Sequence, residues 1–120
     1  MTLPIVTLTD SATGSLARIV PAFGFNCYQF QVQHQGRPVE LLWSAPGFAS
    51  GSERASGSGI PLLFPFPGRI PGTKLVWENR SYELTEGDHR GNAIHGFVLN
   101  RPWRVLDQDN QHVVGQFQAS

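Results

Sequence analysis

The hexapeptide Tyr28-Gln29-Phe30-Gln31-Val32-Gln33 gives the clearest indication of this chain's fold class. Its apolar residues alternate with glutamines, and a period of two is typical of a β-strand with one buried face. The chain is predicted to turn at Gln35-Gly36 and to return as a paired strand over residues 39–43. Before this hairpin, residues 15–20 form another predicted strand, which stops at Pro21.

Two more hairpins are predicted further along the chain. Their strands span residues 74–77 with 81–84, and residues 103–106 with 112–117. No window shows a sustained apolar period of 3.6, and nine prolines and 13 glycines interrupt helices. The fold class is therefore all-β, a sandwich or a barrel. Residues 47–59, rich in glycine and serine, are predicted to form a flexible surface loop.

The bulk composition excludes several classes of partner. Nine basic and nine acidic residues cancel, which gives no electrostatic case for binding nucleic acid or an anionic membrane. No 18-residue apolar window and no signal peptide occur, so no membrane span is predicted. The single cysteine, Cys27, rules out an internal disulfide and suits a reducing compartment, so a cytoplasmic location is expected. The oligomeric state stays open.

The last residues are strand-like as far as the terminus. Only 15% of the residues are charged, which suggests a face that something else covers. A chain that stops on a strand lacks a partner for that strand or leaves an edge unpaired. Residues 1–120 are therefore expected to be the N-terminal part of a single β-sandwich domain that continues beyond residue 120.

Asn92-Ala93-Ile94-His95-Gly96-Phe97 places one histidine, which titrates near neutral pH, among small and apolar residues. Asn92 can fix a turn, and Gly96 leaves space beside the ring. Ile94 and Phe97 are expected to anchor the segment in the core. One interpretation is a structural histidine whose two nitrogens are bound by backbone. The other is an immobilised imidazole that transfers a proton to a ligand.

Phe64-Pro65-Phe66-Pro67-Gly68-Arg69-Ile70 ends in a single arginine on a backbone stiffened by proline. Such an arginine can donate two parallel hydrogen bonds to a carboxylate or to adjacent sugar hydroxyls. An exposed arginine at the end of a loop is the alternative. The phenylalanines that border both motifs are either core residues or the lining of a pocket: Phe64, Phe66 and Phe97.

The remaining titratable groups are interpreted as structural. His34, His89 and His112 lack the spacing of zinc ligands, so no metal site is predicted. Asp88-His89 is interpreted as a solvated turn. The chain has neither a glycine-rich phosphate loop nor a serine or cysteine nucleophile motif.

Taken together, residues 59–70, the hairpin at 74–84, residues 92–97 and Arg101-Pro102-Trp103 resemble the aldose 1-epimerase (galactose mutarotase) family. Their order and spacing match from about residue 15 onward. The resemblance implies a galactose mutarotase-like antiparallel β-sandwich that is longer than this chain. It also implies an isomerase that interconverts the α and β anomers of free aldohexoses and needs no cofactor and no metal.

The resemblance carries over to individual residues. His95 matches the family's first active-site histidine, and Arg69 matches its sugar-binding arginine. Asn92 and Phe97 are expected to border the bound sugar. The family's second histidine and its glutamate base are expected beyond residue 120, so the 120-residue chain alone is expected to be inactive. Many members have asparagine where this chain has Gly68, which leaves the preferred aldose open.

Two other functions stay open from the sequence. A carbohydrate-binding module without turnover would need only the sugar contacts. An epimerase for hexose 6-phosphates would need a basic phosphate pocket, for which Arg54, in the glycine- and serine-rich segment, is the only nearby candidate.

Overall fold

The computed structural model describes residues 2–119, and its extended sheets and hairpins are all antiparallel. The chain forms two compact units. One, here called the sheet unit, comprises the residues up to 62 together with those from 98 onward. The other, here called the loop unit, comprises residues 63–97. The chain is all-β, as the sequence predicts, with an antiparallel architecture consistent with the mutarotase-like β-sandwich.

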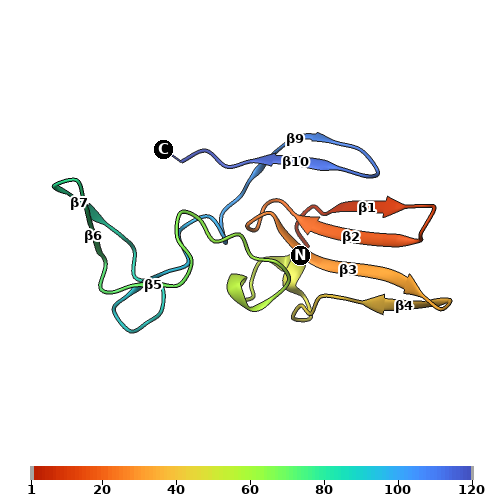
Figure 1. The fold of residues 1–120 in the computed structure, drawn as a ribbon, viewed down its shortest axis with the longest axis horizontal. Coiled ribbons are helices and arrows are strands. Elements are labelled where there is room, and N and C mark those ends of the chain that lie inside the picture. Colours follow the sequence, from red (N-terminus) through yellow and green to blue (C-terminus); the bar gives the residue numbers. More distant parts are fainter. Residues whose placement is uncertain (1, 120) are drawn as a thin grey trace. The chain divides into compact units, whose positions relative to one another are not determined.

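Four strands lie side by side in the sheet unit, in the order of the sequence (Figure 1): β1 (Val6–Asp10), β2 (Ser15–Val20), β3 (Asn26–His34) and β4 (Arg37–Glu40). Gln35 and Gly36, with φ of 52° and 76°, join β3 to β4. Two positive φ values suit the right-handed twist of a two-residue hairpin. The predicted strand at residues 15–20 and the predicted turn are therefore confirmed.

A hairpin of β9 (Arg104–Gln108) and β10 (Val113–Gln116) completes the sheet unit, close to its prediction. Its turn is attached to the four-stranded sheet, because the Thr9 backbone N–H donates to the Asn110 carbonyl over 2.7 Å. Strand β1 is not among the predicted strands, although Val6 and Leu8 alternate with threonines and its burial alternates with them.

The core of the sheet unit includes residues from the segment predicted to be a flexible surface loop. That prediction is wrong. Residues 48–50 and 55–57 form short 3₁₀ helices, and Phe48 is only 2% exposed. The Phe48 ring packs against Phe23 and Tyr28 with ring centroids 5.3 and 5.9 Å apart. One large aromatic residue therefore overrides the polar, glycine-rich composition around it.

Two further expectations need correction. Strand β4 ends at Glu40, so the predicted return strand over residues 39–43 is placed too late, and Trp43 is exposed. Phe30, on the predicted buried face of β3, stays 37% exposed. Gln29 and Gln31 lie on the opposite face of β3, where both donate to the Glu40 carboxylate.

The loop unit contains two short strand pairs. Strands β6 (Lys74–Trp77) and β7 (Arg80–Glu83) form the predicted hairpin, and Glu78 and Asn79 in its turn have φ of 47° and 63°. Strands β5 (Arg69–Ile70) and β8 (Ala93–Ile94) pair with each other. Over the part of the chain that the structure describes, no helix is long and apolar enough to cross a membrane.

Candidate functional site

The two motifs singled out in the sequence meet in the β5–β8 ladder of the loop unit. Arg69 lies opposite Ile94, and Ile70 lies opposite Ala93. Ala93 is 2% exposed and anchors the ladder, whereas Ile94 is half-buried. Antiparallel pairing thus holds the arginine motif and the histidine motif together, although 24 residues separate Arg69 from Ala93 in the sequence.

His95 follows β8 directly and is bound to the residue before β5. The His95 backbone N–H donates to the Gly68 carbonyl over 2.9 Å, and the Gly68 N–H donates to His95 Nδ1 over 3.1 Å. A ring nitrogen that accepts a hydrogen bond carries no proton, so the neutral ring has its proton on Nε2. Within residues 2–119 Nε2 has no hydrogen-bond partner, and the side chain is half-buried.

The structural interpretation of His95 expects the backbone to bind both ring nitrogens. The backbone binds one ring nitrogen, not both, and the imidazole is not enclosed by packed hydrocarbon. The backbone of His95 has φ of 60°, a left-handed conformation uncommon in residues other than glycine. Backbone strain of this kind is concentrated at functional sites. The arrangement presents Nε2–H as a fixed donor.

Gly96 and Phe97 connect the histidine to the phenylalanine-proline segment. Gly96 has φ of 70°, and a Cβ atom at this position would collide with the Phe64 carbonyl. The Phe97 backbone N–H donates to that same carbonyl over 2.9 Å. Phe97 is 39% exposed, so the expectation that it anchors the core is wrong. Its ring and that of Phe64 remain available on the surface of the loop unit.

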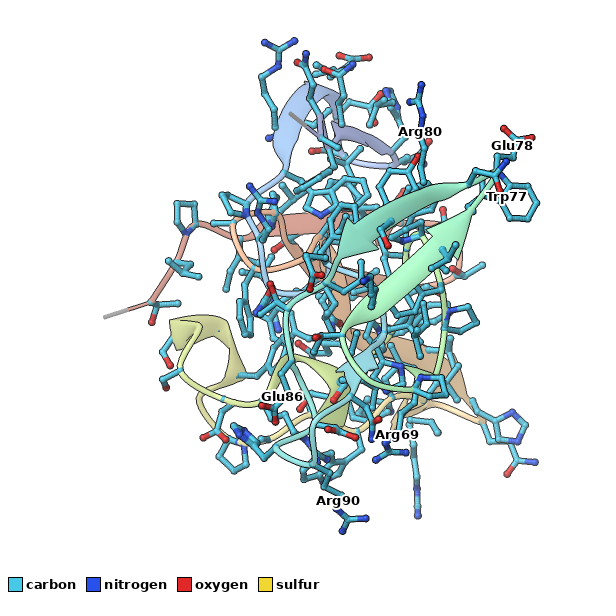
Figure 2. All side chains as sticks on the ribbon, turned by 90° about the vertical axis from the view of Figure 1, so that its left-hand side faces the viewer. Arg69, Trp77, Glu78, Arg80, Glu86 and Arg90 are labelled. Atoms are coloured by element: carbon cyan, nitrogen blue, oxygen red, sulfur yellow. The ribbon has the colours of Figure 1, made fainter. Side chains whose placement is uncertain are left out.

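Arg69 forms an ion pair with Asp88. The Arg69 Nε donates to Asp88 Oδ2 over 2.8 Å. The arginine side chain is 54% exposed, but the aspartate side chain is only 2% exposed. Among residues 2–119 the two Nη atoms of Arg69 have no hydrogen-bond partner. Figure 2 shows Arg69 and Arg90 extending away from the hairpin tip that carries Trp77 and Arg80.

Asp88 accepts three further hydrogen bonds. Asn92 donates its side-chain Nδ2 to Oδ2 over 2.9 Å and its backbone N–H to Oδ1 over 3.0 Å, and the Arg90 backbone N–H donates to Oδ1 over 2.8 Å. The hydrogen bond from the Asn92 side chain is the largest cause of a pKa of Asp88 far below its usual range, and Arg69 lowers it further. Asp88 is therefore ionised and a weak base.

The sequence pattern does not single out Asp88, which it predicts to lie in a solvated turn. The sequence does hold a signal for it. Asp88 lies between Gly87 and Gly91, four residues before Asn92. Aspartate in such a turn commonly accepts hydrogen bonds from the backbone N–H groups that follow it. The predicted sugar contact Asn92 lies in the same network. Its Oδ1 accepts the Gly72 backbone N–H over 2.9 Å, which leaves one side-chain N–H uncommitted.

Other features of the described residues offer less chemistry. No group of three or more metal-ligating side chains occurs within residues 2–119. A groove of about 330 Å³ lies on the sheet unit over β1, β2 and β3. Its titratable group is Asp10, whose pKa is lowered mainly by the Thr13 hydroxyl. None of the predicted site residues lines this groove.

Comparison with known proteins identifies a family for nearly the whole chain. The family model Aldose_epim, described as aldose 1-epimerase, matches residues 4–118. The match includes both units and every residue of the candidate site. No curated protein matches the chain.

Proposed function

The chain belongs to the aldose 1-epimerase family, and we propose that the protein interconverts the α and β anomers of free aldohexoses. The family supports an epimerase-type isomerase acting on a small sugar. In the proposed reaction a base takes the proton of the anomeric hydroxyl while an acid protonates the ring oxygen. The ring opens, the C1–C2 bond rotates, and the ring closes on the other face.

The observation that carries this proposal is the hydrogen bond from the Gly68 N–H to His95 Nδ1. It leaves Nε2–H as the ring nitrogen that can donate a hydrogen bond to a ligand, at a fixed orientation. We assign Nε2–H to a hydrogen bond with a sugar oxygen, where it supports protonation of that oxygen. A held donor of this kind needs no reorganisation when charge develops.

Arg69, Asn92 and Phe97 are proposed to bind the sugar. The two Nη atoms of Arg69 suit a pair of adjacent hydroxyls, and the remaining side-chain N–H of Asn92 suits a third. The exposed ring of Phe97 suits the C–H face of a pyranose. Each contact orients the ring relative to His95.

The base is proposed to lie outside the described site. Asp88, the carboxylate of the site, is fully engaged and has a strongly lowered pKa, so it does not suit proton abstraction near neutral pH. We propose that a glutamate base and a second histidine follow residue 120, within a single β-sandwich domain that continues there. The 120-residue chain alone is accordingly proposed to be inactive.

Polarimetry tests the proposed function. Freshly dissolved α-glucose or α-galactose relaxes to its anomeric equilibrium, and the full protein should speed this relaxation. His95→Ala should slow the catalysed rate by roughly 10²–10⁴-fold. A full protein that leaves relaxation at the buffer rate would contradict the proposal.

A sugar-binding module without turnover is the second candidate. The observation that favours it is that the described site holds a donor and a cation but no uncommitted carboxylate. Saturable binding of an aldohexose together with an unchanged rate of mutarotation would support this alternative. An epimerase of hexose 6-phosphates has no comparable support in the site, where Asp88 offsets the charge of Arg69.

A further inference from the structure

We propose that Asp88 is a positioning residue that fixes how Arg69 presents its Nη atoms and that sets the charge selectivity of the site. This inference rests on the proposed role of Arg69 as a sugar-binding residue. It assigns a function to a side chain that does not itself reach the sugar.

The contact to Nε fixes the direction of the guanidinium. A guanidinium is planar, so a 2.8 Å hydrogen bond from Nε to a buried carboxylate restrains the whole plane. Asp88 then occupies the Nε edge of the Arg69 guanidinium. The two Nη atoms are left to bind a ligand on the exposed side of the arginine. The exposures agree with this arrangement, since Arg69 is 54% and Asp88 2% exposed.

Asp88 is itself held in place. Its Oδ1 accepts the backbone N–H groups of Arg90 and Asn92, and its Oδ2 accepts the Asn92 side chain. Asn92 also accepts the Gly72 backbone N–H, just after β5, and the Ala93 N–H donates to the Gly72 carbonyl over 2.8 Å. The segment from Asp88 to Asn92 is thereby attached to β5 and to β8, so the carboxylate has little freedom to follow a moving arginine.

The pairing also cancels charge. Asp88 stays ionised, because its hydrogen bonds favour the carboxylate, and it offsets the positive charge of Arg69. A paired arginine can still donate to neutral hydroxyls, but it attracts an added carboxylate or phosphate less strongly. Removing the negative charge of Asp88 would leave the Arg69 cation without its counter-ion. The site would then bind anionic sugars more tightly relative to neutral ones.

The test uses the full protein and two ligands that cannot mutarotate: neutral methyl α-glucoside and its anionic counterpart, the methyl glucuronoside. Binding is followed by NMR at the backbone N–H groups of β5 and β8, which every variant retains. We expect Asp88→Asn to weaken binding of the neutral ligand about tenfold and to shift the preference toward the anionic ligand. Asp88→Glu keeps the charge, so it should retain the neutral preference while binding both ligands more weakly.

A double-mutant cycle separates this role from a merely structural one. If Asp88 acts through Arg69, Asp88→Asn should change ligand binding little in a protein that already carries Arg69→Gln. Asp109→Asn is the matched control, since Asp109 also accepts backbone N–H groups but belongs to the sheet unit. It should leave both affinities unchanged.

The outcomes are distinct. Folding of Asp88→Asn is judged by the β5–β8 amide signals. If the folded variant keeps the neutral-ligand affinity of the original protein, the positioning role is overturned, and if it keeps the neutral-to-anionic ratio, the charge role is overturned. If Asp88→Asn does not fold, the ratio measured for Asp88→Glu decides, and a shift toward the anionic ligand overturns the charge role. A protein that binds with the expected ratios but leaves mutarotation uncatalysed refutes the proposed function alone.

Discussion

The Gly68 backbone N–H donates to His95 Nδ1 over 3.1 Å, and the His95 backbone N–H donates back to the Gly68 carbonyl over 2.9 Å. The imidazole thus takes part in the β5–β8 ladder as an acceptor, one position beyond the last strand pair. Among residues 2–119, the hydrogen bond to the ring comes from the backbone and not from a neighbouring side chain. Any change that keeps an acceptor at this position should keep the local fold.

His95→Asn is expected to separate the structural part of the histidine from its chemical part. Asparagine tolerates the left-handed backbone, and its Oδ1 can accept the Gly68 N–H, but it has no group at the position of Nε2. We expect a folded protein whose catalysed mutarotation, measured by polarimetry, falls roughly 10²–10⁴-fold.

His89→Asn is the control for this substitution, because His89 also has a left-handed backbone, with φ of 58°, and is exposed. The mutarotation activity of the His89→Asn protein should match that of the unchanged protein. Full activity in His95→Asn would show that Nε2 has no role in the reaction.

Arg69→Lys is expected to raise KM about tenfold with a much smaller effect on kcat. Lysine keeps the charge, but its single nitrogen cannot donate to Asp88 and to two hydroxyls in the same fixed geometry. Steady-state mutarotation kinetics over a range of glucose concentrations measure the split. Arg80→Lys, on the exposed hairpin of the same unit, should change neither constant. A fall in kcat at constant KM would argue against a binding role for Arg69.

Gly96→Ala is expected to destabilise the loop unit more than a simple backbone penalty would. An alanine held in a left-handed conformation costs about 1–2 kcal/mol, and here its Cβ would also collide with the Phe64 carbonyl. Gly72→Ala is matched to it, because Gly72 has the same φ of 70° but open space around it. Chemical denaturation should show a larger loss for Gly96→Ala, and equal losses would mean that the collision relaxes freely.

The sequence predicts most of the strands because their signals are local. Alternation over residues 28–33 and a turn at Gln35-Gly36 need only neighbouring residues to be interpreted. The buried position of Phe48 could not be predicted in this way, since it depends on contacts with Phe23 and Tyr28 across the fold. A glycine- and serine-rich composition describes the backbone of that segment and not the one side chain that anchors it.

The same distinction applies to the candidate site. The sequence motifs indicate both residues, because prolines and a glycine flank Arg69 and a glycine follows His95. Asp88 was missed because its partner Arg69 is 19 residues away and meets it only once β5 and β8 have paired. The use of His95 Nδ1 as an acceptor likewise depends on that pairing.

The β9–β10 hairpin carries a pH-dependent contribution to stability at His112. Its Nε2 lies 3.0 Å from Asp107 Oδ2, and its Nδ1 lies 2.9 Å from Asp109 Oδ2. The hydrogen bond to Asp107 is the largest cause that raises the pKa of His112 above its ordinary 6.5, and the negative charge of Asp109 adds to it. A raised pKa in the folded state means that the folded protein binds the proton more tightly than the unfolded chain does.

The stabilisation is therefore fully present below pH 6.5 and is lost as the pH rises through the raised pKa. Denaturant unfolding followed across this range should show a modest decline in the free energy of unfolding, because all three side chains are exposed. His112→Gln should remove that decline, whereas His34→Gln, at the exposed end of β3, should leave it in place. A decline of unchanged size in His112→Gln would assign the pH dependence to another group.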